Sequence, residues 1–410
     1  ISTGNGGGTS ARGRGLQNDN VDNWSGYDSF HGFGIGVHDS SGQVMFDSII
    51  AYNNGDYVAA FGGYNNEPDT VRDDLQGGQT GDGWIRTASV NKHIWYGAIS
   101  TLEHNINENL SFVGGIDIRY YVGEHFRKVE NLLGNTTYLS SFDMNNSSNF
   151  IDYGSGSSFG SFSENSYLNN NNLLYHNDGI VKWLGAFGQI EYSNDKFSFF
   201  SSLSLSNQGF KRIDYFNYMD DDSLQTTNWQ IFNGGTFKTG FNFNVNQNMR
   251  VFVNTGYFSK QPIFNNIFLN YQNDINTNAN NQSVRAFEIG YSYYNKLIDF
   301  DINAYYTEWK DRQYSRRFAP PLGHPRYDVF YLFYGISQTH KGLEAEINMN
   351  LSDKISMSGM VSLGDWVYTN NINSRSTILD AFGNFTADSS DSVKILYAKG
   401  LKVGDAAQHT

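Results

Sequence analysis

Basic and aromatic side chains gather in one polar stretch of the C-terminal third of the chain. Its members are Arg312, Tyr314, Arg316, Arg317, Phe318, Arg326 and Tyr327. A guanidinium group pairs with carboxylates through two parallel hydrogen bonds and stacks on aromatic rings. One interpretation is therefore a site for an anionic ligand, made by the four arginines and Tyr314. A solvated loop, or a contact with another anionic surface, is the alternative.

Other residues that could bind a metal ion lack a suitable spacing. Asp220, Asp221 and Asp222 supply oxygen ligands but not the alternate spacing of a calcium loop, which favours a solvated loop. The histidines at 93, 104 and 125 are too scattered along the sequence to define a site. Cysteine is absent, which excludes a disulfide and a thiolate site. We expect no metal and no cofactor.

The sequence contains no catalytic signature. A nucleophile elbow, an HExxH zinc motif and a glycine-rich phosphate loop between a strand and a helix are all missing. Glu344 and Glu346 lie two apart, but one strand alone provides no catalytic geometry. The net charge of -13 argues against a nucleic-acid partner. We expect a protein that is not an enzyme.

Apolar and polar residues alternate with a period of two in many segments. Leu343, Ala345 and Ile347 fall on one strand face, while Glu344 and Glu346 fall on the other. The same pattern recurs at 110–119, 237–245, 300–306 and 355–363. Alternation predicts antiparallel strands with one apolar face, in a soluble sandwich or in a membrane barrel.

The lengths of the connections separate these two architectures. Short connections with Asn, Asp or Lys turn chemistry are expected at 106–109, 193–196, 246–248, 295–296 and 351–354. Long polar stretches lie between them, at roughly 126–178, 208–230, 260–282, 312–332 and 368–390. Outer-membrane barrels show this asymmetry, with short periplasmic turns and long extracellular loops. The pattern predicts an all-β, antiparallel transmembrane β-barrel.

Further features agree with a barrel. The sequence has no run of about 18 apolar residues, which a transmembrane helix would need. Barrel strands need only about 10 residues of alternating character. Aromatic residues near the predicted strand ends, such as Trp95, Tyr120 and Trp366, fit an interfacial girdle. Ordinary cross-strand pairing of aromatic rings is the alternative explanation.

The expected organisation has two parts. Residues 91–404 form transmembrane strands with long extracellular loops, about ten strands with an eleventh candidate at 391–404. Residues 1–90 form a long extracellular loop region after a missing strand. Because a barrel must close in lipid, we also expect the final closing strand to be absent from this sequence.

Charged residues on the inward strand faces need partners. These residues are Arg119, Lys238, Asp301, Glu344 and Glu346. Buried polar groups are costly unless they are hydrogen-bonded, so a plug inside the barrel or water would satisfy them. We expect these side chains to face the lumen and to hold such a plug.

Several segments, in their order and spacing, resemble the barrel of TonB-dependent outer-membrane receptors. They are IWYGAIS to ENLLG (94–134), DGIVKWLGAFGQIEYS (178–193), VFVNTGYFSKQPIFNNIF (251–268), FEIGYSYY (287–294), NAYYTEWKDR (303–312) and HKGLEAEINMNLSDKISMSGMVSLGDW (340–366). The resemblance implies a 22-stranded barrel of the cell outer membrane with an N-terminal plug domain. It also implies energised uptake through an inner-membrane TonB complex, which pulls on a short N-terminal box. The sequence shows no plug, no recognisable box and no aromatic-terminated last strand.

We therefore expect an internal piece of a receptor, about 10–12 strands of the barrel. The implied function is import of a scarce nutrient, such as a ferric chelate or another small ligand. Expected partners are outer-membrane lipid, lipopolysaccharide, the plug domain and the TonB complex through the missing N-terminus. A passive porin or structural barrel, or a secreted β-rich adhesin, remains the alternative. The identity of the substrate does not follow from the sequence.

Overall fold

The computed structural model describes most of the chain. The described residues are 2–5, 16–18, 39–41, 43–54, 56–59, 70–72, 84–131, 133–134, 137–140, 143–146, 149–152, 172–269, 271–318, 328–352, 354–379, 393–404 and 408. They divide into two compact units. Unit 1 comprises Ile1–Trp95, Tyr121–Ile180 and Lys211–Asn228, and unit 2 comprises Tyr96–Tyr120, Val181–Phe210 and Trp229–Thr410.

Ten long strands carry the architecture. They are β4 (Trp84–Asn105), β5 (Leu110–Asn131), β8 (Asn172–Ser193), β9 (Phe197–Asp214), β10 (Gln230–Asn246), β11 (Met249–Lys260), β14 (Gln282–Tyr294), β15 (Ile298–Phe318), β16 (Asp328–Ser352) and β17 (Ile355–Tyr368). Each pairs with the next in a single sheet of 14 strands, and every pairing with a printed register in this sheet is antiparallel. The described sheet is open. The predicted all-β barrel fold, present in part, is confirmed.

All five predicted short turns join consecutive long strands. In four of them an asparagine side chain accepts a hydrogen bond from the backbone two residues ahead. These asparagines are Asn107, Asn194, Asn246 and Asn295. Such Asx turns close a hairpin locally. The turn chemistry that marked these positions in the sequence therefore also fixes their geometry.

The strands continue farther into the predicted long loops than the sequence suggested. β5 reaches Asn131, β8 begins at Asn172 and β15 reaches Phe318. Apolar alternation ends earlier, but backbone pairing does not require it, since each ladder bond needs only an N–H and a C=O. The predicted strand at 391–404 is shorter, because β19 (Val393–Leu396) has four residues and pairs with β18 (Ile372–Leu379).

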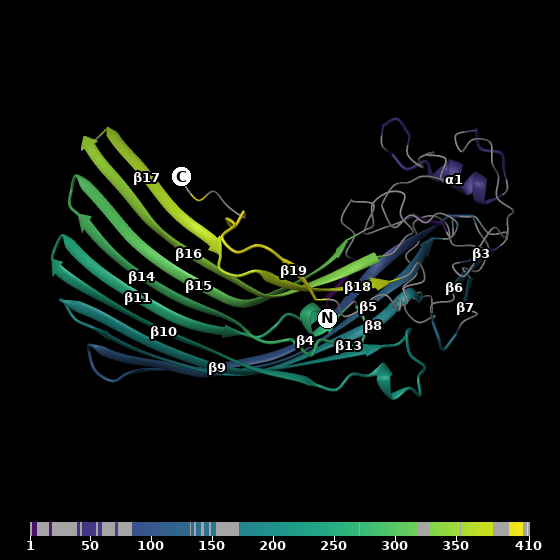
Figure 1. Cartoon of the computed structure of the whole chain (residues 1–410), viewed down its shortest axis with the longest axis horizontal. Helices are drawn as coiled ribbons and strands as arrows, with labels where there is room; N and C mark the ends of the chain where they lie inside the picture. Colours follow the sequence, from purple (N-terminus) through teal and green to yellow (C-terminus); the bar gives the residue numbers. More distant parts are fainter. Residues whose placement is uncertain are drawn as a thin grey trace. The chain divides into compact units, whose positions relative to one another are not determined.

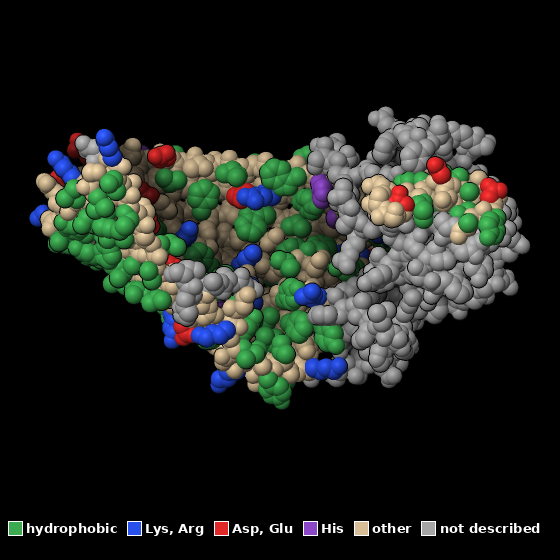
Figure 2. Space-filling model, turned by 90° about the horizontal axis from the view of Figure 1, so that it is seen from above, with side chains coloured by type: hydrophobic (Ala, Val, Ile, Leu, Met, Phe, Trp, Pro, Cys, Tyr) green, Lys and Arg blue, Asp and Glu red, His purple; other side chains and the backbone are tan. Residues whose placement is uncertain are grey.

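The long strands of unit 2 leave their apolar face exposed, and their charged side chains lie on the other face. Phe237, Phe241 and Ile289 on the apolar face are each 44% exposed. On the other face, rings lie over glycines: a Cβ on Gly240 or Gly290 would come within 2.3 Å of a phenylalanine ring atom. Figure 1 shows these strands bending together into a trough, and Figure 2 looks into it, where charged side chains are visible. A soluble protein would reverse this arrangement.

Shorter elements complete each unit. Unit 1 contains β1 (Ser2–Asn5), β2 (Leu16–Asn18), α1 (Phe46–Asn53), β3 (Thr70–Arg72), β6 (Thr137–Ser140), β7 (Asn149–Asp152) and the 3-10 helix η3 (Ser223–Gln225). In unit 2, α2 (Phe264–Ile267) packs Ile267 and the adjacent Phe268 on Phe210 of β9. It is followed by β12 (Phe268–Leu269) and β13 (Asp274–Ile275). None of the helices in the described residues has the length and apolar character needed to span a membrane.

Candidate functional site

Arg312 lies against an aromatic ring on the polar face of unit 2. Its guanidinium carbon is 5.1 Å from the centre of the Trp309 ring, and its Nη1 donates a hydrogen bond to Gln338 Oε1 at 2.7 Å. In a regular strand, residues three apart point to opposite faces. The pairing register shifts between Trp309 and Arg312, and Asp311 has a φ of 56°. This bulge turns Arg312 to the side of Trp309.

The contacts continue from Gln338 across three strands. His340 stacks on Trp366, with ring centres 5.2 Å apart, and its Nε2 lies 3.4 Å from Gln338 Oε1. Trp366 Nε1 donates to the hydroxyl of Tyr305 at 2.9 Å. We call this set the arginine–aromatic face; its members are Tyr305, Trp309, Arg312, Gln338, His340 and Trp366. Tyr305 lies two residues from Asn303, so the set belongs to the polar side of the sheet.

The predicted basic patch lies on paired strands where the structure describes it, rather than in a loop. Tyr314 stacks on Phe333 of β16 at 6.4 Å, and Phe333 stacks on Tyr331 at 5.9 Å. Arg316 is opposite Tyr331 in the register. Arg312, Tyr314 and Arg316 follow one another at alternate positions of β15 and so share a face. The side chain of Arg317 and all of Arg326 lie outside the described residues.

Acidic side chains occupy the polar face on the turn side of Tyr305. Asp301 is opposite Glu346 and Asn303 is opposite Glu344. Asp301 accepts a hydrogen bond from Ser292 Oγ, and Glu288 accepts bonds from Asn254 at 3.3 Å and from Asn303 at 2.9 Å. We call Glu288, Asp301, Glu344 and Glu346 the acidic row. Its negative charge lies next to the cationic part of the same face.

The other two residues expected to face inward also lie on the polar side of their strands. Lys238 Nζ lies 6.0 Å from the centre of the Phe258 ring. Arg119 forms an ion pair with Asp117 at 2.6 Å, on the face of β5 opposite Ile116 and Ile118. Both cations therefore already have partners within the sheet.

Unit 1 holds a second group of polar side chains on β4, β5 and β8. Glu124 bridges Lys92 Nζ at 3.0 Å and His176 Nε2 at 3.1 Å. Beside it, the hydroxyl of Tyr215 donates to Asp178 Oδ2 at 2.9 Å. Lys92, Glu124, His176 and Asp178 lie beyond the exposed apolar parts of their strands, and Tyr215 directly follows β9. Burial and the neighbouring Asp178 carboxylate raise the pKa of Tyr215, and burial raises the pKa of Asp178.

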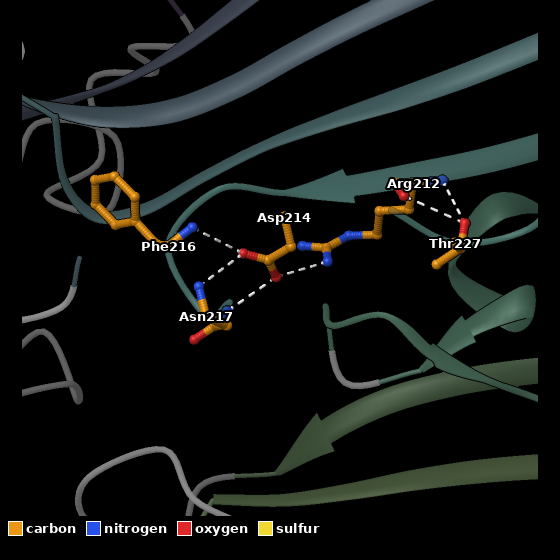
Figure 3. Close-up of polar contacts among 5 residues, drawn as sticks. All are labelled: Arg212, Asp214, Phe216, Asn217 and Thr227. Atoms are coloured by element: carbon orange, nitrogen blue, oxygen red, sulfur yellow. Dashed lines mark hydrogen bonds and ion pairs between the residues drawn. The ribbon is translucent and has the colours of Figure 1, made fainter. Parts of the chain in front are cut away.

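A buried ion pair closes the end of β9 (Figure 3). Arg212 Nη1 donates to Asp214 Oδ2 at 2.7 Å, and the two side chains are 4% and 2% exposed. Asp214 also accepts from the backbone N–H groups of Phe216 and Asn217, while the backbone N–H of Arg212 donates to Thr227 Oγ1. These bonds hold the chain as it leaves the strand, which indicates a structural role.

Two contacts of histidines did not follow from the sequence. His340 lies within the arginine–aromatic face, stacked on Trp366. His93 and His125, expected to be too scattered along the sequence to define a metal site, lie on neighbouring strands with ring centres 6.1 Å apart. The pairing of distant strands created both contacts, and spacing along the sequence carries no signal of it. Within the described residues, no three His, Asp or Glu side chains converge as a metal-binding group.

Comparison with known proteins identifies the family. The model described as "TonB dependent receptor-like, beta-barrel" matches residues 2–410. The chain belongs to this family. No curated protein sequence matches this TonB-dependent receptor barrel.

Two solved structures of transporters are similar to this chain. The copper transporter OprC is similar to this receptor barrel with a TM-score of 0.50 and 9% identity, over 72% of this chain and 42% of that one. The FrpB iron transporter from Neisseria meningitidis (F3-3 variant) is similar with a TM-score of 0.42 and 11% identity, over 72% and 41%. The chain spans less than half the length of either protein. At this identity the likeness to OprC shows the fold alone.

Proposed function

We propose that this chain is the barrel part of an outer-membrane receptor that imports a scarce nutrient. The exposed apolar face of the sheet carries the proposal: its Phe, Ile and Leu side chains suit lipid, and the charged face on the other side suits an aqueous lumen. Membership of the TonB-dependent receptor barrel family supports the same location. Outer-membrane lipid and lipopolysaccharide are then the surroundings of the exposed face.

The arginine–aromatic face is the proposed ligand contact. Arg312 offers a planar cation that already lies near an indole ring, and His340 with Trp366 offers a stacked pair nearby. Such groups bind anionic ligands by charge-assisted hydrogen bonds and by stacking. A ferric chelate with carboxylate groups has this chemistry. Tyr314 and Arg316 extend the same face toward the far end of β15.

The acidic row and the two inner cations, Lys238 and Arg119, are the proposed contacts for a plug domain. Their charges line the polar face. Lys238 and Arg119 already contact Phe258 and Asp117, and a second polypeptide would add to these contacts. A plug that carries basic groups would complement Asp301, Glu344 and Glu346. Coupling to an inner-membrane TonB complex through a segment N-terminal to this chain completes the proposed transporter.

Energised uptake tests this function. Cells that produce the full-length protein would be given radiolabelled ferric citrate, with and without a functional TonB protein. Uptake that disappears without TonB and falls in an Arg312→Ala variant would support an energised receptor for an anionic chelate. Uptake that is independent of TonB would instead support a passive porin. Absence of uptake in both strains would overturn the choice of this ligand class.

A further inference from the structure

Three potential metal ligands converge over a glycine on the polar face of β4 and β5. A Cβ added to Gly123 would lie 2.4 Å from the hydroxyl oxygen of Tyr121 and 2.9 Å from Nε2 of His125. The absence of a side chain at Gly123 therefore leaves a space into which both atoms point. His93 reaches the same place from β4, since its Nδ1 lies 2.6 Å from the Tyr121 hydroxyl.

The geometry of the two imidazole rings is compatible with one shared ion. The rings of His93 and His125 have centres 6.1 Å apart and meet edge to face, with an interplanar angle of 76°. Imidazole nitrogens bind Zn²⁺ at roughly 2.0–2.1 Å. Two rings on one ion then have centres about 5–6 Å apart, so the ligands need only small movements to close around it.

A second residue fixes the orientation of His125. Its Nδ1 hydrogen-bonds to the side-chain oxygen of Asn91 on β4. Because a carbonyl oxygen can only accept, the proton lies on Nδ1 and the lone pair of Nε2 faces the space over Gly123. Metal-binding histidines are oriented in this way by an acceptor on the other ring nitrogen. His125 thus offers Nε2 as a ligand atom, and Asn91 holds its ring in the orientation that binding requires.

We propose that His93, Tyr121 and His125 form a binding site for a single divalent transition-metal ion, with Cu²⁺ bound most tightly. Two imidazole nitrogens and one phenol oxygen suit copper, nickel and zinc, and affinity for such donors is highest for Cu²⁺. On binding, the ion takes the place of the proton shared by Tyr121 and His93, and that proton leaves to the solvent. The site is independent of the proposed ligand at the arginine–aromatic face.

Electron paramagnetic resonance of the purified full-length protein with Cu²⁺ alone tests the site. We expect one tight Cu²⁺ per chain, with superhyperfine splitting from two imidazole nitrogens. His93→Ala and His125→Ala should each remove this signal. Gly123→Ala should weaken binding without removing any ligand, because its Cβ fills the space. Asn91→Ala should lower the affinity by roughly 10–100-fold, as loss of an orienting partner does.

His104→Ala is the matched control, since His104 is an exposed histidine on the same strand, outside the cluster. It should leave the tight signal unchanged. Unaltered resistance of each variant to SDS before heating would show that the barrel is still folded. The proposal is overturned if folded His93→Ala and His125→Ala variants keep the two-nitrogen signal, or if no tight Cu²⁺ binds. A signal lost in His104→Ala alone would likewise overturn it.

Discussion

The indole Nε1 of Trp366 donates a hydrogen bond to the hydroxyl of Tyr305 at 2.9 Å, although the two residues lie 61 positions apart. The bond passes over Gly342 of the intervening strand. A Cβ there would lie 2.5 Å from the Tyr305 hydroxyl. The glycine thus lets two aromatic side chains from β15 and β17 meet across β16 and build one continuous face.

Loss of this hydrogen bond should lower the free energy of unfolding while the aromatic rings of the face stay in place. Trp366→Phe keeps an aromatic ring against His340 but leaves the Tyr305 hydroxyl without its donor. We expect a loss of about 1 kcal/mol in the free energy of unfolding, the usual net value of such a bond. Urea unfolding in detergent measures it. An equal loss when Trp366→Phe is made in a Tyr305→Phe background would contradict a direct coupling.

Arg312 should respond to loss of its planar shape as well as loss of its charge. Arg312→Lys keeps the charge but cannot form a bidentate pair or stack on Trp309 in the same way. We expect both Arg312→Lys and Arg312→Ala to lower affinity for ferric citrate by roughly 10-fold or more, the scale of a charged hydrogen bond. Calorimetry of the full-length protein gives the affinities. Arg285→Ala, at an exposed arginine on the opposite side of the sheet, is the control and should bind as the parent does.

Glycines on the polar face should not tolerate a methyl group where a ring covers them. At Gly290 a Cβ would lie 2.3 Å from two atoms of the Phe252 ring. Gly290→Ala should therefore destabilise the sheet by about 1–3 kcal/mol, as overpacking does. At Gly359 the nearest atom, on Ile347, is 3.6 Å from the added Cβ, so Gly359→Ala should cost little. Equal unfolding midpoints for the two variants would contradict the proposed packing.

The ion pair that closes β9 should be sensitive to loss of one partner. Asp214→Ala leaves the Arg212 guanidinium buried at 4% exposure without its carboxylate, and it frees the N–H groups of Phe216 and Asn217. We expect a loss of about 3–5 kcal/mol, the cost of breaking a buried pair. Replacement of both, in Arg212→Met with Asp214→Ala, should recover part of it. Hydrogen exchange at 212–227 locates the effect, and unchanged protection there would contradict the structural role.

The carboxyl group of Asp178 should make stability depend on pH. Burial raises its pKa in the folded state, so the folded protein holds the proton more tightly than the unfolded chain does. Stability from this group is therefore present below the ordinary pKa of aspartate and is lost as pH rises through the raised value. Asp178→Asn keeps an acceptor for Tyr215 and should remove this loss. The pH dependence of the unfolding midpoint measures it, and identical profiles for parent and variant would contradict the assignment.

Local features allowed much of the fold to be predicted from sequence. Asn107 and Asn246 marked turns because an asparagine side chain bonds to the backbone two residues ahead, and the alternation of Leu343 with Glu344 assigned strand faces. The site depended on nonlocal geometry. Arg312 reaches Trp309 only through a bulge, and His93 meets His125 only through the register of two long strands. Periodicity contains neither fact.

The orientation of the two faces is the central claim, and site-directed spin labelling tests it most directly. The chain has no cysteine, so single substitutions label cleanly. Labels at Phe241, Val253 and Ile289 should be accessible to oxygen dissolved in lipid, and labels at Asn242, Asn254 and Glu288 to a water-soluble nickel chelate. The account predicts that accessibility alternates with a period of two in native outer membranes. Labels that are equally accessible on both faces, or a reversed alternation, would contradict it.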